Sequence, residues 1–233
     1  MPPHSGNPDM GSKHGAIFDL DGTLVDTIED LTHSFNRALV SLGYPHHTLS
    51  EFKAMVGEGV TRLTESALPP GSRDEAKVAE LRAAFQADYA KHLLDNSVPF
   101  PGITDLLGRL ASKGWPMGVL SNKDQGNSET MVGRLFPGTF KAVFGAIPER
   151  PYKPDPKGAL ELARILERDP QAIFYFGDSD TDMRLARNAG FVPIGVSWGF
   201  RPWEVVRDAG AKAILGRPLD FLKVFRELAG GLL

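Results

Sequence analysis

Two aspartates, Asp19 and Asp21, stand one residue apart, directly behind a short apolar run and in front of Gly22. Asp178 and Asp182 follow another apolar run later in the chain. Like charges held about 4 Å apart repel by roughly 4 kcal/mol at an effective dielectric near 20, so a cluster of these four acids needs a cation. Carboxylates without His or Cys select a hard ion, and Mg²⁺ prefers a few such oxygens together with waters and substrate phosphate.

Other polar residues also follow apolar runs. Ser121 and Asn122 come directly after "GVL", and Lys153 lies in "RPYKPDPKG" behind a further run. Ligands of open parallel sheets bind beyond the carboxyl ends of the strands. If these runs are parallel strands, the polar residues meet the acids at one edge, where Lys153 adds a second positive charge. Such a site attracts a phosphate dianion.

The elements that position these residues alternate between apolar runs and helical patterns from residue 97 onwards. The runs are "PMGVLSN", "AVFGAI", "AIFYFGDSD", "VPIGVSW" and "AIL". This alternation is typical of parallel strands joined by helical crossovers. Together with the opening run "GAIFDL", it predicts a doubly wound, Rossmann-like α/β core with a parallel sheet.

Residues 26–96 show a different pattern, with no convincing strand. Apolar residues recur there every three or four positions, at Ile28, Leu31, Phe35, Leu39 and Leu42, and again at Val78, Leu81, Phe85, Tyr89 and Leu93. This spacing predicts two amphipathic helices, and a further helix is expected after Gly59. We therefore predict a mobile tail over 1–13, an α/β core from 14–25 and 97–233, and an α-helical cap over 26–96 inserted after the first strand.

The composition narrows the class of partner. The 233 residues carry a formal net charge of −3 with scattered basic residues, so nucleic acid and membrane surfaces are disfavoured and a small-molecule partner is favoured. The absence of cysteine excludes disulfides, thiolate metal sites and cysteine nucleophiles. The opening "MPPHSGNPDMGSKHG" lacks the apolar stretch of a secretory signal, and no segment approaches the ~20 apolar residues that cross a bilayer. We expect a cytoplasmic protein.

Four segments resemble known motifs. "FDLDGTLVDT", "VLSNK", "YKPDP" and "FGDSDTDM" resemble the four ordered motifs of the haloacid dehalogenase-like hydrolase superfamily. The inserted helical block, with "NRALVSLGYP" and "MVGEGVTRLTESAL", is similar to the cap of its phosphoglycolate phosphatase branch. The resemblance implies a Mg²⁺-dependent phosphatase of a small organic phosphate monoester, with 2-phosphoglycolate as the leading candidate.

The resemblance also implies catalytic roles. Asp19 matches the nucleophile that becomes an aspartyl-phosphate, and Asp21 matches the general acid and base. The Asp19 carboxylate, the Asp21 backbone carbonyl and Asp178 match metal ligands. Lys153 matches the lysine that orients the nucleophile and offsets the transferring charge. Asp182 matches an outer-shell acid that holds metal-bound water or Lys153.

Phosphate-binding positions follow from the same resemblance. Ser121 and the backbone N–H of Asn122 match the phosphate site of the second motif, and Thr23 joins them from the first motif. These groups would act as fixed hydrogen-bond donors to the phosphoryl oxygens.

The cap segment "VGEGVTR" supplies candidate substrate contacts. Gly57 and Gly59 would let the backbone approach a ligand closely. Arg62 is expected to pair with a substrate carboxylate, because a guanidinium matches carboxylate geometry bidentately. The alternative is that this segment is only a glycine-bearing turn that starts a helix.

Other functions stay open at this point. A dehalogenase is disfavoured because that chemistry needs no acid two residues after its nucleophile, and Asp21 is present. A phosphosugar mutase, which returns the phosphoryl group to its substrate, would have the same core and a similar cap. A non-catalytic protein that senses a phosphorylated metabolite is the third possibility. The sequence is compatible with a monomer or a homodimer.

Overall fold

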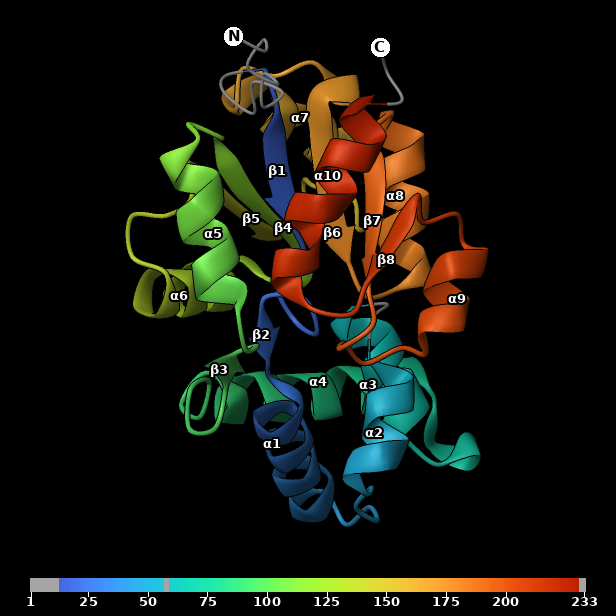
Figure 1. The fold of residues 1–233 in the computed structure, drawn as a ribbon. Helices are drawn as coiled ribbons and strands as arrows, with labels where there is room; N and C mark the ends of the chain where they lie inside the picture. The colour runs from blue at the N-terminus through green and yellow to red at the C-terminus, as the bar shows by residue number, and fades with distance from the viewer. Residues whose placement is uncertain (1–12, 57–58, 231–233) are drawn as a thin grey trace, which may run out of the picture.

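A parallel sheet of six strands forms the centre of the molecule (Figure 1). The computed structural model describes residues 13–56 and 59–230. The strands of this sheet are β1 (Gly15–Phe18), β4 (Met117–Asp124), β5 (Ala142–Ala146), β6 (Ile173–Gly177), β7 (Val192–Val196) and β8 (Ala213–Leu215). Their order is β5-β4-β1-β6-β7-β8, and neighbouring strands are parallel. The predicted doubly wound α/β core is confirmed.

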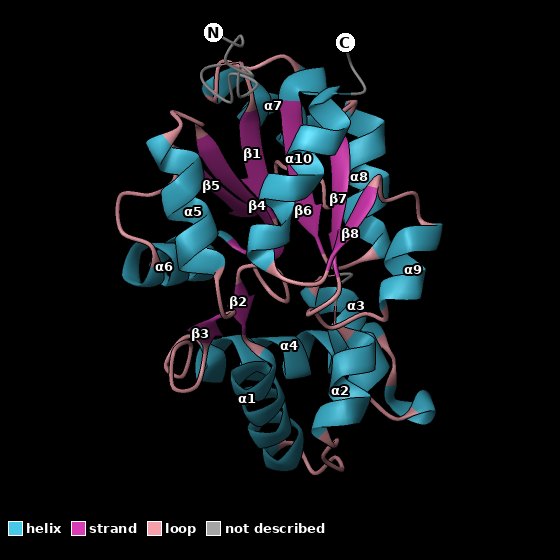
Figure 2. Cartoon of the chain, viewed as in Figure 1, coloured by secondary structure: helices cyan, strands magenta, loops and turns pink. Residues whose placement is uncertain are grey.

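Helices cover both faces of the sheet (Figure 2). They are α5 (Ile103–Ser112), α6 (Gln125–Leu135), α7 (Lys157–Ile165), α8 (Asp180–Ala189), α9 (Trp203–Asp208) and α10 (Phe221–Gly230). Successive strand residues point to opposite faces. Ile17 therefore packs with α7 and α8, whereas Phe18 packs with α5 and α10. Burying a side chain of this size stabilises the fold by roughly 1.5–3 kcal/mol.

The helical cap consists of the helices between residues 27 and 97. They are α1 (Ile28–Ser41), α2 (Leu49–Met55), α3 (Val60–Ala67) and α4 (Glu75–Tyr89). They lie together beyond the carboxyl ends of the sheet strands (Figure 1). Their apolar faces meet in a stack in which the ring centroids of Phe35 and Phe85 are 3.8 Å apart. The block 26–96 was predicted to contain no strand, and among its described residues only Asp26, at the end of a two-residue strand, departs from that prediction.

Two details of the cap differ from the sequence expectation. Helix α2 was not predicted, although Thr48 and Glu51 form a capping box at its start, a pattern visible in the sequence. Helix α4 ends at Tyr89, and Leu93 lies buried in the turns that follow it. None of the helices in the described part of the chain is long and apolar enough to cross a bilayer.

Two chain connections join the cap to the sheet. Strand β2 (Val25–Asp26) pairs in antiparallel fashion with β3 (Val98–Pro99), so the outgoing and returning chains run side by side. This agrees with a cap inserted after the first strand, while the domain boundaries themselves stay a prediction. The predicted tail lies almost wholly outside the described residues.

Candidate active site

The acids of the first motif lie at the carboxyl end of the central strand. Phe18 pairs with Val119 on β4 and with Phe176 on β6, so the residues that follow these strands emerge together. The backbone N–H of Asp19 continues this pattern by donating to the carbonyl of Phe176 at 2.9 Å. Parallel register therefore brings segments more than a hundred residues apart to one edge of the sheet. Asp178 follows β6 at the same edge.

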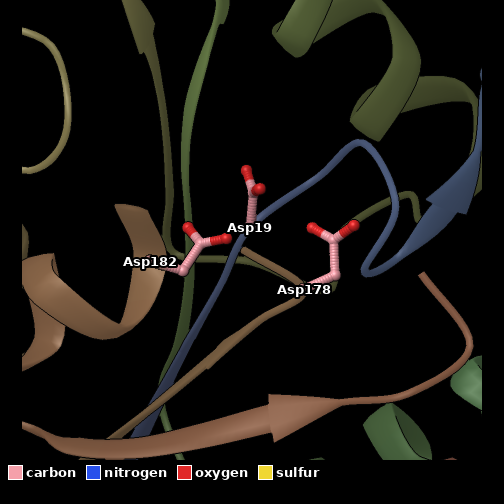
Figure 3. A group of neighbouring side chains, drawn as sticks. All are labelled: Asp19, Asp178 and Asp182. Carbon is pink, nitrogen blue, oxygen red and sulfur yellow. The ribbon is translucent and has the colours of Figure 1, made fainter. Parts of the chain in front are cut away.

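Three buried carboxylates converge there (Figure 3). Asp19, Asp178 and Asp182 each offer one oxygen, and these oxygens lie within 4.8 Å of one another. Asp182 is fixed by a capping box at the start of α8, in which its carboxylate accepts from the backbone N–H of Ser179 at 3.2 Å, and it accepts a further bond from the Ser179 hydroxyl at 2.6 Å. Local capping chemistry thus places one acid of the cluster.

Lys153 is the cation of this cluster. Its ammonium lies 2.8 Å from a carboxylate oxygen of Asp19 and 2.8 Å from one of Asp182. Burial alone would lower the pKa of Lys153, but the negative charges of Asp182 and Asp19 outweigh burial and raise it. The Asn122 side chain holds the backbone of Lys153, accepting its N–H at 2.8 Å. Tyr175 donates a further hydrogen bond to Asp182 at 3.0 Å.

The remaining carboxylate oxygens fit a cation. One oxygen of Asp19 accepts from the backbone N–H of Leu20 and from Lys153, and one oxygen of Asp178 accepts from the N–H of Phe200 at 2.7 Å. The second oxygen of each meets no donor from another described residue. Both oxygens of Asp182 are occupied by Ser179, Lys153 and Tyr175. The donor set therefore suits a hard ion held by Asp19 and Asp178, with Asp182 behind them.

The electrostatics show the same need for positive charge. Burial, followed by the charge of Asp182, raises the pKa of Asp178 to about 7. Burial and Asp182 also raise the pKa of Asp19 well above its usual range, against the pull of Lys153. One lysine does not balance the three acids, and a divalent ion would.

Two glycines leave room for Asp178. A Cβ atom added at Gly22 or at Gly199 would collide with the Asp178 side chain. Gly22 also has φ +81°, a conformation that other residues adopt only with strain. The glycine after the paired aspartates is thus required by the packing of Asp178.

Asp21 has partners of its own. Its carboxylate accepts from the Thr27 hydroxyl at 2.8 Å and from the Lys123 ammonium at 3.0 Å. Lys123 also donates to the hydroxyl of Tyr89, the last residue of α4, at 2.6 Å. Lys123 was not among the predicted site residues, although it stands directly after Ser121 and Asn122 in the second motif.

A cavity of about 90 Å³ lies between the acids and the cap. Core residues on its wall are Asp19, Asp21, Ser121, Asn122, Lys123, Asp124, Asn127, Lys153 and Phe200. Cap residues on its wall are Leu31, Val56, Gly59, Val60, Leu63, Phe85, Gln86 and Tyr89. The core side is polar and charged and the cap side is mostly apolar, so a polar ligand group would face the sheet edge.

Some predicted substrate contacts do not reach this wall. Arg62 is 70% exposed at its side chain and pairs with Glu65 at 3.3 Å on the surface of α3. Thr23 is fully buried, and its hydroxyl has no partner among the described residues. Gly59 does line the cavity, whereas Gly57 lies outside the described residues. The structure therefore brings together all the predicted core residues except Thr23, and not Arg62.

The fold and the site define a doubly wound α/β protein with an acidic centre beneath a helical cap. A family model described as haloacid dehalogenase-like hydrolase matches residues 16–196. The chain belongs to the haloacid dehalogenase-like hydrolase family, as the four motifs indicated.

Relatives of the chain within this family include phosphoglycolate phosphatases. The chain is 32% identical over 210 residues to a phosphoglycolate phosphatase of Pseudomonas putida, covering 88% of this chain and 72% of that protein. It is 31% identical over 216 residues to a phosphoglycolate phosphatase of Mesorhizobium japonicum, covering 91% of this chain and 93% of that one. A solved structure of a haloacid dehalogenase-like hydrolase from Streptococcus pneumoniae superposes with a TM-score of 0.83 at 26% identity, covering 91% of this chain and 98% of that chain.

Proposed function

We propose that the chain is a Mg²⁺-dependent phosphatase that hydrolyses 2-phosphoglycolate through an aspartyl-phosphate on Asp19. One observation carries this proposal. Asp19 lies on the cavity wall with one carboxylate oxygen held by Lys153 at 2.8 Å and the other free of protein donors among the described residues. The phosphoglycolate phosphatases among its relatives support the choice of substrate.

In the first half of the reaction, an oxygen of the Asp19 carboxylate attacks phosphorus and the bond from phosphorus to the ester oxygen breaks. Asp21 gives a proton to that leaving oxygen, so glycolate departs with a hydroxyl group there instead of an alkoxide. Lys153, the Ser121 hydroxyl and the Asn122 backbone N–H act as fixed donors to the transferring phosphoryl oxygens. The product of this half is a covalent acyl phosphate on Asp19.

In the second half, Asp21 has lost its proton and acts as a base. It takes a proton from a water, whose oxygen attacks phosphorus and releases inorganic phosphate. The Asp19 carboxylate is thereby restored. Thr27 and Lys123 hold the Asp21 carboxylate in place for both steps.

Asp19, Asp178 and the backbone carbonyl of Asp21 are the proposed ligands of Mg²⁺. The bound ion would supply positive charge that polarises the phosphoryl oxygens and offsets repulsion between the acids and the substrate. Asp182 instead positions Lys153, because both its oxygens already accept hydrogen bonds. The phosphate-binding role of Thr23 stays a prediction.

The cavity lies between the charged edge of the sheet and the mostly apolar wall of the cap. The phosphoglycolate phosphatases among the relatives support a small phosphorylated acid as substrate rather than the sugar phosphate of a mutase. The cytoplasmic location and the monomeric or homodimeric state rest on the sequence alone and stay predictions.

A phosphate-release screen tests the proposal. Small phosphorylated acids, sugar phosphates and nucleotides are each incubated with the protein in Mg²⁺ and in excess chelator. We expect the highest kcat/KM for 2-phosphoglycolate and no release in chelator. Isomerised sugar phosphate without phosphate release would instead identify a mutase, and no turnover of any ester in Mg²⁺ would favour a sensor.

A further inference from the structure

The cavity wall carries a second buried cation that the chemistry above uses only indirectly. The Lys123 side chain is 5% exposed and lies at the end of β4, on the wall that faces the cap. An ammonium has three N–H donors. The two Asp21 oxygens, at 3.0 and 3.3 Å, can share one of them, and the Tyr89 hydroxyl takes another. The third meets no acceptor among the described residues.

Tyr89 leaves a second donor unused beside it. Its hydroxyl accepts from Lys123, and its own proton has no acceptor in the described part of the chain. Burial and the charge of Asp21 raise the pKa of Tyr89, so the phenol keeps this proton. The residue is 2% exposed, and a buried O–H group without an acceptor is costly. A ligand oxygen would satisfy it.

We propose that Lys123 and Tyr89 form a carboxylate subsite. The Lys123 ammonium and the Tyr89 hydroxyl both donate to the carboxylate of a substrate whose phosphate faces Asp19. This inference rests on the proposed function and names the groups that select a phosphorylated acid over a phosphate ester without a carboxylate. Because Lys123 belongs to the core and Tyr89 to the cap, the carboxylate bridges the two parts of the molecule.

No other cation among the described residues competes for this role on the cavity wall. Lys153 is held between Asp19 and Asp182 at 2.8 Å each. Arg62 points to solvent and pairs with Glu65. Among the cap side chains on the wall, Val60, Leu63 and Phe85 are apolar, and Gln86 is polar but carries no charge. A buried carboxylate needs paired charge, and Lys123 supplies it.

The test compares two substrates of similar size, 2-phosphoglycolate and ethyl phosphate, of which only the first has a carboxylate. The measured quantity is the ratio of their kcat/KM values in Mg²⁺. Hydrogen bonds to charged groups of this kind correspond to about 10- to 100-fold in such a ratio. We expect Lys123→Met to lower the ratio by about 100-fold and Tyr89→Phe by about 10-fold. Lys123→Arg should restore part of the loss.

Matched controls separate this effect from general damage. Lys141 is exposed and Tyr44 is half-buried, and neither lines the cavity, so Lys141→Met and Tyr44→Phe should keep the wild-type ratio. Lys123→Met also removes the charged partner of Asp21, which keeps its bond from Thr27, and is checked for folding by its thermal transition. Tyr89→Phe keeps the aromatic stack on Phe85, so it tests the subsite even if the lysine variant unfolds.

The outcomes distinguish the subsite from the proposed function. If Lys123→Met and Tyr89→Phe slow both esters by the same factor, Lys123 acts only by holding Asp21 and the subsite is wrong. A fall in the ratio in Arg62→Ala alone would assign the carboxylate to Arg62 instead. A wild-type protein that hydrolyses neither ester contradicts the proposed function and the subsite together.

Discussion

Lys153 holds two acids of different roles at once. Its ammonium contacts Asp19, the proposed nucleophile, and Asp182, which is fully buried. Although burial lowers the pKa of Lys153, the negative charges of Asp182 and Asp19 raise it overall, so its ammonium stays charged at neutral pH. The lysine thereby fixes the orientation of the Asp19 carboxylate through one oxygen and leaves the other oxygen without a protein donor among the described residues. Removing one partner of such a buried group leaves uncompensated charge behind.

Lys153→Met should therefore affect both stability and turnover. We expect the free energy of unfolding to fall by about 3–5 kcal/mol, the usual cost of breaking a buried ion pair, measured by urea denaturation. We expect kcat to fall by about 100-fold or more, since a fixed donor to the phosphoryl group is lost. Lys157→Met, at an exposed position at the start of α7, is the matched control and should change neither quantity. Unchanged stability in Lys153→Met would contradict the role of this lysine.

Some of the site residues that the sequence revealed are fixed by a strand end. Asp19 and Asp178 could be predicted because each directly follows a strand whose neighbours are set by parallel order. Tyr89 could not, because its approach to the core depends on how the cap packs. Arg62 was predicted from the chemistry of its guanidinium alone. On α3 the buried side is formed by Leu63 and Ala67, and successive helix residues are rotated by about 100°, so Arg62 lies on another side of the helix.

At the scale of elements, one buried acid forms hydrogen bonds between the outgoing and the returning connection of cap and core. Asp30, in the first turn of α1, accepts from the backbone N–H groups of Asn96 and Ser97 and from both side chains, with the Ser97 hydroxyl at 2.6 Å. These contacts stand next to the pairing of β2 with β3. The position of the cap on the sheet therefore depends on a few polar contacts at its base.

Asp30→Asn should loosen this attachment. Burial raises the pKa of Asp30, but the hydrogen bonds from Ser97 and Asn96 outweigh burial and lower it. A lowered pKa contributes stability above the unfolded value near 3.9, and this stability is lost as the pH falls through the folded value. We expect the variant to be less stable by about 1.5–3 kcal/mol at pH 7, with a smaller difference from wild type at pH 3.

Urea denaturation at both pH values measures this difference, and Glu29→Gln is the matched control. Glu29 is exposed in the same helical turn, so its substitution should have little effect at either pH. A difference between wild type and Asp30→Asn that is equal at pH 7 and pH 3 would show that the ionised carboxylate is not the source of stability.

Long periodic elements could be predicted from the sequence, and short ones could not. The six apolar runs became the six strands of the sheet, because buried parallel strands are nearly continuous apolar segments. Strands β2 and β3 have two residues each and include Pro99, so they carry no periodic signal. They form because the cap helices return the chain to its starting point. Helix α2 has one fully buried apolar residue, Phe52, so it shows no apolar period, although the capping box of Thr48 and Glu51 is a local signal for its start.

At the scale of the whole molecule, the cap and the sheet enclose an acidic centre whose negative charge exceeds its positive charge. Asp19, Asp178 and Asp182 are buried together with one lysine between them. The raised pKa values of Asp19 and Asp178 mean that ionising these carboxyl groups is unfavourable in this buried, acidic environment. A bound divalent ion lowers that cost. Metal binding, ionisation of the acids and stability of the fold should therefore depend on one another.

The stabilisation by Mg²⁺ should increase with pH. Asp178 has its pKa raised to about 7, so its contribution to stability is fully present below the unfolded value near 3.9 and is lost as the pH rises through 7. Mg²⁺ binds the ionised form. At a concentration about 100 times its Kd, an ion stabilises by about 2.7 kcal/mol, which corresponds to roughly 5–10 °C in Tm for a protein of this size.

Thermal unfolding in Mg²⁺ and in chelator, at pH 6 and pH 8, measures this dependence. We expect a clearly larger rise of Tm at pH 8 than at pH 6. Asp178→Asn should show little Mg²⁺-dependent rise at either pH, since it lacks one of the proposed ligands. An equal rise at both pH values in the wild-type protein would place the ion elsewhere.

The covalent role of Asp19 is tested most directly by rapid acid quench of the Mg²⁺-loaded protein during turnover of 2-phosphoglycolate, followed by mass analysis of its peptides. We predict one added phosphoryl group on the peptide that contains Asp19, present within the first turnover and absent in Asp19→Asn, which should release no phosphate. A phosphoryl group on a different residue, or full turnover by Asp19→Asn, would contradict the proposed mechanism.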